Sequence, residues 1–385
     1  MKKLGLILLA ASVLAGCGSD DDVNLTIKIS EIEVGPDNNL WIAMDDETNP
    51  RIQVLEQETQ SSDTILLDQP ARAIKFYRSN DADYYAMQLV ASDYSSSQLA
   101  IGNVNGDRTA TSGYGVQSKS GYTINTHGNT LYHIGKFDID TLTKYNMDIG
   151  FSQSVWNYSP NDDASDSANT YTIVHSSNNN AYVIRYGNAS FLTVDTSAID
   201  EASFILGRTD LSAYNQEEKN NPGMSDGVVL NDKLYVLMQR QDATWTAGVA
   251  YVAVFDISDE ENPVEIDTDP SNEGLKGIEL GCRNPNNLHV NGTDIYVVCH
   301  GVYSAQNTGI EKINTSDYSV TSIADHTTFS NLVLSEDQTN HISDLAFDSE
   351  QGYISVNINS GYDLIESHIF TLDTQTDEIG EKISL

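Results

Sequence analysis

The segment NDKLYVLM, residues 231–238, decides the fold, because its pattern returns along the whole chain. A turn rich in Asn, Asp, Gly or Ser is followed by a small or aliphatic residue and then by an aromatic residue that opens an apolar run. Six other segments share it: NNLWIAM, DADYYAMQLV, GNTLYHIG, NNNAYVIRYG, NGTDIYVVCHG and SEQGYISVNI. The aromatic residues are Trp41, Tyr85, Tyr132, Tyr182, Tyr235, Tyr296 and Tyr353, spaced 44 to 61 residues apart. This period suits a unit of four short strands.

Further strand-like runs flank each aromatic segment. Downstream, an apolar stretch ends at a turn residue, as in KFDIDT, LTVDTS and AVFDIS, where Asx and Ser/Thr side chains favour chain reversal. Upstream, short alternating apolar runs such as residues 29–34 and 342–347 are typical of half-buried strands. We therefore predict an all-β, seven-bladed β-propeller with four antiparallel strands per blade. A count of six or eight blades is an open alternative, because the sequence pattern of the first blade is weak. In addition, no ring closure between residues 25–34 and 381–385 is evident.

The beginning of the chain predicts export. Lys2 and Lys3 precede an apolar stretch at residues 4–14, and small residues follow, which is the pattern of a signal peptide over residues 1–16. Its apolar core is too short to span a bilayer. The sequence LAGC at residues 14–17 resembles the lipobox of bacterial lipoproteins, which implies lipid on Cys17 and cleavage before it. Residues 17–24 would then form a lipidated tether, and 25–385 one propeller domain. The alternative is an ordinary secreted protein with a cysteine near its cleavage site.

Resemblance also suggests a location and a role. Gly18, rather than Asp, follows the cysteine, and lipoprotein sorting in Gram-negative bacteria implies the outer membrane for such a protein. Whether it faces the periplasm or the outside stays open. The segments LYVL at 234–237 and DIYVV at 294–298 resemble YVTN-type, surface-layer-like propellers over nearly the whole mature chain. Together with the lipobox, the chain resembles propeller lipoproteins that capture nutrients beside TonB-dependent transporters, including corrinoid-binding ones. This implies a role but carries over no site residue.

The net charge excludes some classes of binding partner, and the cysteines allow a disulfide. The chain has 20 Lys+Arg against 56 Asp+Glu, and removal of the leader lowers its formal net charge from −36 to −38. Such a charge argues against nucleic acid and against docking on anionic lipid head groups. We interpret it as a solvated acidic coat, with cation capture as the alternative. After lipidation of Cys17, Cys282 and Cys299 would be left in an oxidising compartment, either as a disulfide or as two buried thiols.

Loop length points to a binding face. With strands A to D numbered outward from the axis, the A–B and C–D turns open on one face and are expected to be short. The B–C and D–A loops open on the other face, and long examples are residues 90–98, 148–169, 208–226, 239–249, 301–309 and 359–367. These carry the aromatic residues Tyr94, Trp156, Tyr158, Tyr214, Trp245, Tyr303 and Tyr362. Such side chains suit recognition of a sugar, a planar cofactor or a protein, although each one could instead pack under its own loop.

Other residues are expected at the mouth of the central channel. They lie at the starts of the innermost strands: Arg72, Asp226, Asn286, Asn287 and His341. Propeller lactonases hold a metal there that activates water, which gives a hydrolase as an alternative function. However, the eight histidines show no metal-ligand spacing. The segments NVNGD (103–107) and DDASD (162–166) offer oxygen ligands for calcium, but ordinary turn chemistry explains them as well.

These observations favour a binding protein over an enzyme. The chain has no Gly-Xaa-Ser-Xaa-Gly elbow, P-loop or dinucleotide fingerprint. The leading hypothesis is a membrane-anchored propeller that binds a small nutrient or an envelope protein through its long loops. The alternatives are the metal-dependent hydrolase or lactonase at the channel mouth and a structural or adhesive surface protein.

Overall fold

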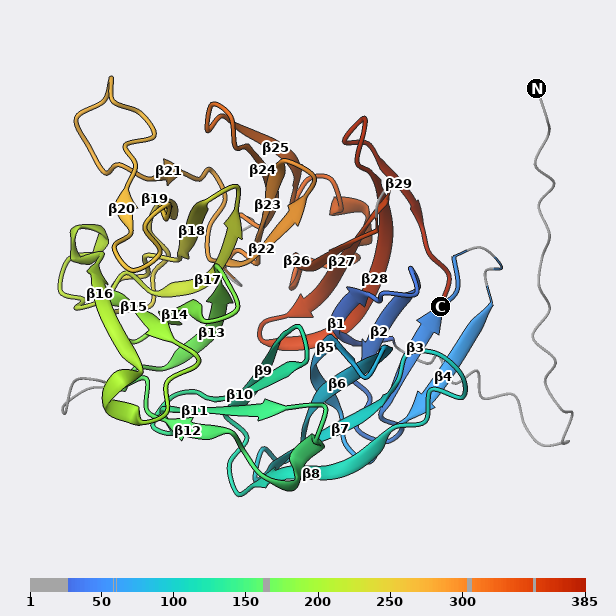
Figure 1. The fold of residues 1–385 in the computed structure, drawn as a ribbon. Helices are drawn as coiled ribbons and strands as arrows, with labels where there is room; N and C mark the ends of the chain where they lie inside the picture. Colours follow the sequence, from blue (N-terminus) through green and yellow to red (C-terminus); the bar gives the residue numbers. More distant parts are fainter. Residues whose placement is uncertain (1–26, 58, 60, 162–166, 303–306, 349–350) are drawn as a thin grey trace, which may run out of the picture.

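The computed structural model describes residues 27–57, 59, 61–161, 167–302, 307–348 and 351–385. They form a seven-bladed β-propeller in which each blade is an antiparallel sheet of four successive strands (Figure 1). The fifth blade has one additional short strand, β21, beside its third strand. The predicted fold class and the count of seven blades are confirmed. No helix among the described residues is long and apolar enough to cross a membrane.

Each blade uses its strands in chain order from the axis outward. Blades 1 to 4 consist of β1 Ile29–Val34, β2 Leu40–Met44, β3 Arg51–Leu55, β4 Ser62–Leu66; β5 Ala71–Ser79, β6 Ala82–Val90, β7 Ser97–Asn103, β8 Thr111–Gln117; β9 Tyr122–His127, β10 Thr130–Gly135, β11 Thr141–Asn146, β12 Trp156–Tyr158; and β13 Thr170–His175, β14 Asn180–Arg185, β15 Ser190–Asp195, β16 Ile205–Asp210. Blades 5 to 7 consist of β17 Met224–Leu230, β18 Lys233–Met238, β19 Tyr251–Asp256, β20 Val264–Glu265, β21 Ile278–Glu279; β22 Pro285–Asn291, β23 Asp294–Cys299, β24 Gly309–Asn314, β25 Val320–Asp325; and β26 Gln338–Phe347, β27 Gln351–Ser360, β28 Asp363–Asp373, β29 Ile379–Lys382. The described 3-10 helices are η1 Gly150–Ser152, η2 Glu201–Ser203, η3 Ser212–Tyr214 and η4 Ser330–Leu332.

The repeated aromatic residue lies on the second strand of every blade, where it is buried. In blade 5, Tyr235 is 1% exposed and packs with Leu237, Val252 and Ile295 between two blades. The other six, from Trp41 to Tyr353, are at most 3% exposed. Because neighbouring blades cover both faces of this strand, its apolar run is continuous, as in strands that are buried on both sides. The repeated aromatic residue and the apolar run that follows it therefore reflect packing of each second strand between neighbouring blades.

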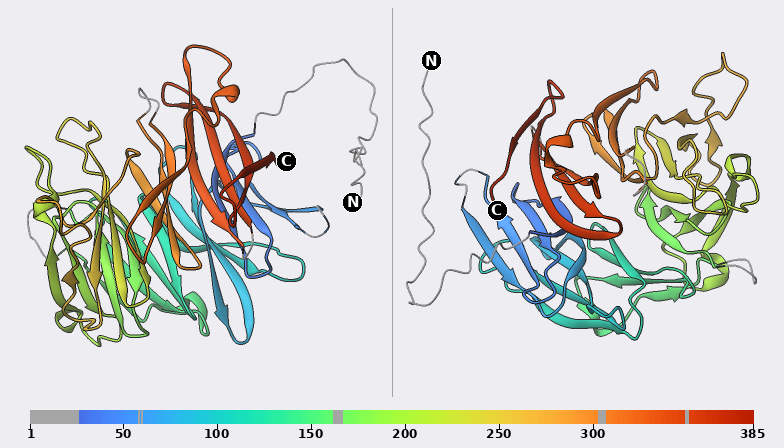
Figure 2. Two further views of the ribbon diagram at one scale, coloured as in Figure 1. Left: turned by 90° about the horizontal axis from the view of Figure 1, so that it is seen from above. Right: turned by 180° about the vertical axis from the view of Figure 1, so that it is seen from behind.

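The ring closes without exchange of a strand between the two ends of the chain. β1 opens blade 1 next to the axis and β29 ends blade 7 at the rim, so no blade combines strands from both termini. Closure instead depends on contacts between blades 1 and 7, which lie side by side in both views of Figure 2. Ile32 N donates to Asp344 Oδ2 at 2.9 Å, and Ile29 N donates to Ser367 Oγ at 3.0 Å. Each of these bonds joins residues more than 300 positions apart in the sequence, so no local sequence pattern could predict them.

The B–C and D–A connections lie on one face, which we call the long-loop face, and the A–B and C–D turns on the short-turn face. Two expectations about them need correction. The range 148–169 is not one loop, because β12 runs through it, and residues 208–210 belong to β16. The range 359–367 is not a long loop either, because β27 ends at Ser360 and β28 begins at Asp363. The C–D turns of blades 3 and 4 are also not short, because they contain η1 and η2. These two outermost strands carry little hydrophobic pattern, because β12 has only three residues and β16 buries none of its six.

Candidate ligand-binding site at the central cavity

A cavity of about 570 Å³ lies on the propeller axis and is lined by the innermost strands of all seven blades. Four of the five residues expected at the channel mouth line it: Arg72, Asp226, Asn286 and Asn287. Its wall continues into B–C connections through Asp45, Lys136, His300 and Tyr362. Because these connections belong to the long-loop face, the cavity opens on that face.

His341 differs from the other four residues, because it is not part of the cavity wall. It is 6% exposed, its Nδ1 lies 2.8 Å from the carbonyl oxygen of His300, and its Nε2 lies 2.8 Å from Thr339 Oγ1. Burial lowers the pKa of its imidazole. The expectation that His341 points into the channel mouth is therefore wrong. The pairing of β26 with β27 shifts between Ile342 and Asp344, so that Ser343 and Asp344 line the wall instead.

The acids of the cavity wall connect neighbouring blades. Asp226 accepts hydrogen bonds at 2.8 Å from the backbone N–H of Gly227 in its own blade and of Leu288 in the next. Asp344 accepts in the same way from Leu345 and, across the ring closure, from Ile32. Each acid follows an irregularity in its strand that turns the side chain toward the next blade. Both carboxylates therefore hold the ring together.

A third acid makes the same kind of bond in blade 1, and sequence reasoning missed it. Glu31 Oε2 accepts a hydrogen bond from the N–H of Ile74 in blade 2 at 2.9 Å, and its other oxygen lies 3.3 Å from Lys75 Nζ. Lys75 also forms a close ion pair with Glu33. An acidic residue two positions after the first buried apolar residue of an innermost strand is the signal that Glu31, Asp226 and Asp344 share.

Burial shifts the pKa values of these groups. It raises the pKa of Asp226 to about 6 and that of Asp344 to about 7, against the opposing effect of their backbone hydrogen bonds. It also raises the pKa of Glu31, although Lys75 opposes that shift. For Lys75, burial favours the neutral amine, but Glu33 and Glu31 outweigh burial and raise the pKa of the ammonium group. The centre of the cavity therefore holds fewer negative charges at neutral pH than its composition suggests.

The cations of the wall differ in whether an acid pairs with them. Arg72 Nη1 forms an ion pair with Asp45 at 2.9 Å. Lys136 Nζ has no acidic partner within ion-pair distance among the described residues and lies 4.7 Å from the centre of the Tyr171 ring. Burial lowers the pKa of Lys136. A cation over an aromatic ring and next to open space can accept an anionic group from a ligand.

The wall offers little for a metal ion. Within the described parts of the chain, no group of three or more His, Cys, Asp or Glu residues is arranged to hold one. His289 Nε2 lies 3.8 Å from Asp344 Oδ1, and burial lowers its pKa to about 3, so that its imidazole is neutral. Of the two calcium patterns, the one at 103–107 contains a turn in which Asp107 accepts a bond from the N–H of Thr109. The other, at 162–166, lies outside the described residues.

The six loop aromatics among the described residues divide into two groups. Three close hairpins or loops on the long-loop face and are exposed: Tyr94 at 62%, Trp245 at 68% and Tyr362 at 85%. Trp156 and Tyr158 instead lie on β12, and Tyr214 lies on η3, each at most 9% exposed. The expectation that these three belong to an exposed binding surface is wrong, because their rings fill space between blades or under a connection. Tyr303 lies outside the described residues.

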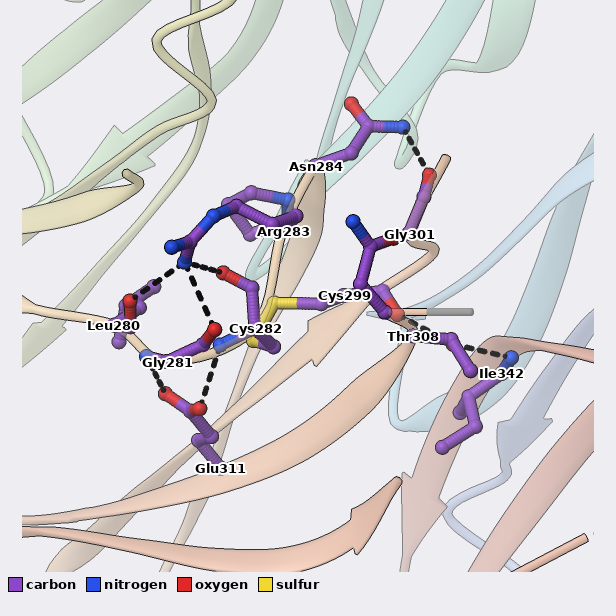
Figure 3. Close-up of a disulfide and its surroundings, with 12 residues drawn as sticks. Leu280, Gly281, Cys282, Arg283, Asn284, Cys299, Gly301, Thr308, Glu311 and Ile342 are labelled. Carbon is purple, nitrogen blue, oxygen red and sulfur yellow. Dashed lines mark hydrogen bonds between the residues drawn. A yellow bond between two sulfur atoms is a disulfide. The ribbon is translucent and has the colours of Figure 1, made fainter. Parts of the chain in front are cut away.

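A disulfide stabilises the rim of the cavity at blade 6. Cys282, just before β22, is bonded to Cys299 at the end of β23, with their Cα atoms 5.9 Å apart (Figure 3). Glu311 accepts hydrogen bonds from the N–H of Gly281 at 3.0 Å and of Cys282 at 2.7 Å. The bridge thus fixes the segment that leads to Asn286 and Asn287 against the one that leads to His300. A closed loop of this length contributes about 3 kcal/mol in the chain-entropy model.

Comparisons with known proteins identify the fold and no family. No protein-family model and no curated protein sequence matches the chain. Among solved structures, it is similar to hydrazine synthase from Kuenenia stuttgartiensis (TM-score 0.54, 12% identity, 96% of this chain and 99% of the other). It is also similar to the β-propeller domain of the trilobed protease from Pyrococcus furiosus, described as having an open velcro topology (0.53, 8%, 94% and 98%). Virginiamycin B lyase from Staphylococcus aureus is a third (0.51, 11%, 84% and 89%). At these identities the likeness shows a propeller alone.

Proposed function

We propose that this chain is a lipid-anchored envelope protein that binds a small polar ligand in the central cavity of its propeller. The observation that carries the proposal is the cavity itself, which opens on the face with the exposed aromatic residues Trp245 and Tyr362. Its volume of about 570 Å³ lies within the usual range of small-molecule sites. The lipobox at residues 14–17 supports the anchor, and Gly18 supports the outer membrane as its location.

The hydrogen bonds and ion pairs of the charged residues in the cavity wall support ligand binding rather than catalysis. Asp226 and Asp344 each use both carboxylate oxygens to accept backbone hydrogen bonds, so neither is available to move a proton without loosening the ring. Arg72 is paired with Asp45. Lys136 is the wall cation without an acidic partner among the described residues, which makes it the natural contact for a carboxylate or phosphate on the ligand.

A thermal-shift screen of the mature protein against corrinoids, haem, glycans and siderophores tests this function. A compound that binds the cavity should raise the unfolding midpoint of the wild type, and the shift should be at least halved in Lys136→Met. Lys276→Met is the matched control, because Lys276 has a 52% exposed side chain outside the cavity, 3.9 Å from Glu265 on the outermost strand of blade 5. The function is contradicted if no class shifts the midpoint, or if the two variants respond alike.

A further inference from the structure

The described chain starts on the long-loop face, beside the mouth of the cavity. The carbonyl oxygen of Ile27 accepts a hydrogen bond from Ser367 N, and that of Lys28 accepts one from Asp45 N, both at 2.7 Å. Asp45 follows β2 on the long-loop face and lines the cavity. The segment that leads back to Cys17 is therefore joined to the ring at the end of the axis where the cavity opens.

The length of that segment limits how the ring can be oriented. Ten peptide steps separate Cys17 from Ile27, which gives a reach of ~35 Å when fully extended and an average span of ~18 Å when flexible. To reach the plane of the short-turn face, the tether must cross the width of a four-strand blade, ~14 Å, and then run along the height of a six-residue strand, ~20 Å. Only a fully stretched tether could place that face on the membrane. A relaxed tether keeps the long-loop face close to the lipid.

The exposed side chains of the long-loop face suit the surface of a membrane. Trp245 and Tyr94 are held at their loop tips with φ of 66° and 57°, a strained conformation for residues other than glycine. The Trp245 loop is fixed by Asp242, which accepts hydrogen bonds from Thr244 N at 2.8 Å and Thr246 N at 2.9 Å. The amino group of Lys219 lies 5.0 Å from the Trp245 ring. Tryptophan and tyrosine rings, and cationic groups close to them, are favoured in the head-group region of a bilayer.

We propose that the long-loop face lies against the phospholipid head groups of the membrane that carries the lipid on Cys17, so that the cavity opens toward that membrane. The inference rests on the lipid anchor of the proposed function. The net charge of the mature chain, −38, opposes contact with anionic lipids. The partner surface is therefore one of zwitterionic head groups, and a ligand leaves the cavity on the membrane side.

Trp245 provides a built-in reporter for this orientation. It is one of three tryptophans, and the other two are buried, with Trp41 0% and Trp156 6% exposed. The full-length lipidated protein is reconstituted into phosphatidylcholine vesicles that contain a lipid with a nitroxide on its head group. Quenching should remove roughly a third of the tryptophan emission of the wild type, since one ring of three is exposed. Trp245→Phe should lose almost none.

A pair of labelled variants on opposite faces gives the control. Ala243→Cys lies beside Trp245 on the long-loop face, and Thr293→Cys lies on an A–B turn of the short-turn face; both positions are exposed. A fluorophore at position 243 should be quenched more than one at position 293. Equal or stronger quenching at position 293 would overturn the orientation.

Two further readouts separate the anchor from the orientation. Mass spectrometry that finds an unlipidated mature N-terminus would overturn the anchor, and with it this inference. A lipidated protein without quenching of Trp245 would overturn the orientation alone. Replacing part of the phosphatidylcholine by phosphatidylglycerol should weaken the quenching of Trp245, and stronger quenching would contradict the proposed preference for zwitterionic head groups.

Discussion

Two adjoining connections on the long-loop face use their aromatic residues in opposite ways. In the D–A connection at residues 211–223, Tyr214 is 1% exposed, and its hydroxyl donates to Glu265 Oε1 at 2.5 Å and accepts from Gly277 N at 2.7 Å. In the B–C connection at 239–250, Trp245 is 68% exposed. The two connections touch, because Arg240 Nε donates to the carbonyl oxygen of Tyr214.

The difference follows from the path of each connection. A D–A connection runs from the rim of one blade to the axis of the next, so it crosses packed strands and needs apolar side chains beneath it. A B–C connection joins neighbouring strands of one blade, and nothing covers its tip. Aromatic residues at the tips of long B–C connections, such as Tyr94 and Trp245, are therefore exposed, whereas Tyr214 packs beneath its D–A connection.

The largest expected effect separates a buried tryptophan from an exposed one. Trp156 on β12 stacks on Tyr158, with ring centroids 4.8 Å apart, and its Nε1 donates to the carbonyl oxygen of Thr196 at 3.1 Å. Trp156→Ala should lower the free energy of unfolding by about 3–5 kcal/mol, because it leaves a cavity between blades. Trp245→Ala should change it by less than about 0.5 kcal/mol. Urea denaturation followed by circular dichroism measures both, and similar losses would break the comparison.

The acids of the same face allow a second test, through pH. The Asp344 side chain is 8% exposed, and burial raises its pKa from 3.8 to about 7. The folded state therefore keeps a proton that the unfolded chain releases, so this group's contribution to stability is present below about pH 4 and is lost as pH rises to about 7. The loss is ~4 kcal/mol at most.

The measurement compares wild type with Asp344→Asn in urea at about pH 4.5 and about pH 7.5. The wild type should lose stability relative to the variant as pH rises. Asp242→Asn is the control at the exposed loop. Hydrogen bonds from Thr244 and Thr246 lower the pKa of Asp242, so its stabilising contribution is lost only as pH falls below the usual carboxylate range. A stability difference between wild type and Asp344→Asn that stays constant with pH would show that the ring acids are not coupled to folding in this way.

The smallest expected effect on stability comes from removing a single tyrosine hydroxyl group on each connection. Tyr214→Phe leaves the N–H of Gly277 and a carboxylate oxygen of Glu265 without their partner and should cost about 1–3 kcal/mol. Tyr94→Phe on a B–C connection should cost less than about 0.5 kcal/mol, because Tyr94 is 62% exposed. Thermal unfolding of the two variants and the wild type gives the ranking. The reverse ranking would mean that the path of a connection does not govern how its aromatic residues are used.

The sequence predicted part of the candidate site, and the reason lies in position along the strand. Arg72, Asp226, Asn286 and Asn287 were located because the start of every innermost strand must face the axis. Glu31 was missed, although it shares with Asp226 its position two residues after the first buried apolar residue of the strand. Lys136 was missed because nothing in its local sequence distinguishes it from the other charged residues of the chain. His341 was misplaced by a shift in strand pairing that its neighbours in sequence do not reveal.

The sequence by itself determined the all-β class and the seven repeats, because each blade buries its second strand on both sides and must repeat the same apolar run. Tertiary structure alone decided that the ring closes through Asp344 and Ile32. It also decided that Lys136 has no acidic partner among the described residues, and that Trp245 is exposed while Tyr214 is buried. These depend on which segments meet across the ring. Local periodicity records whether a residue is buried, but not which distant residue buries it.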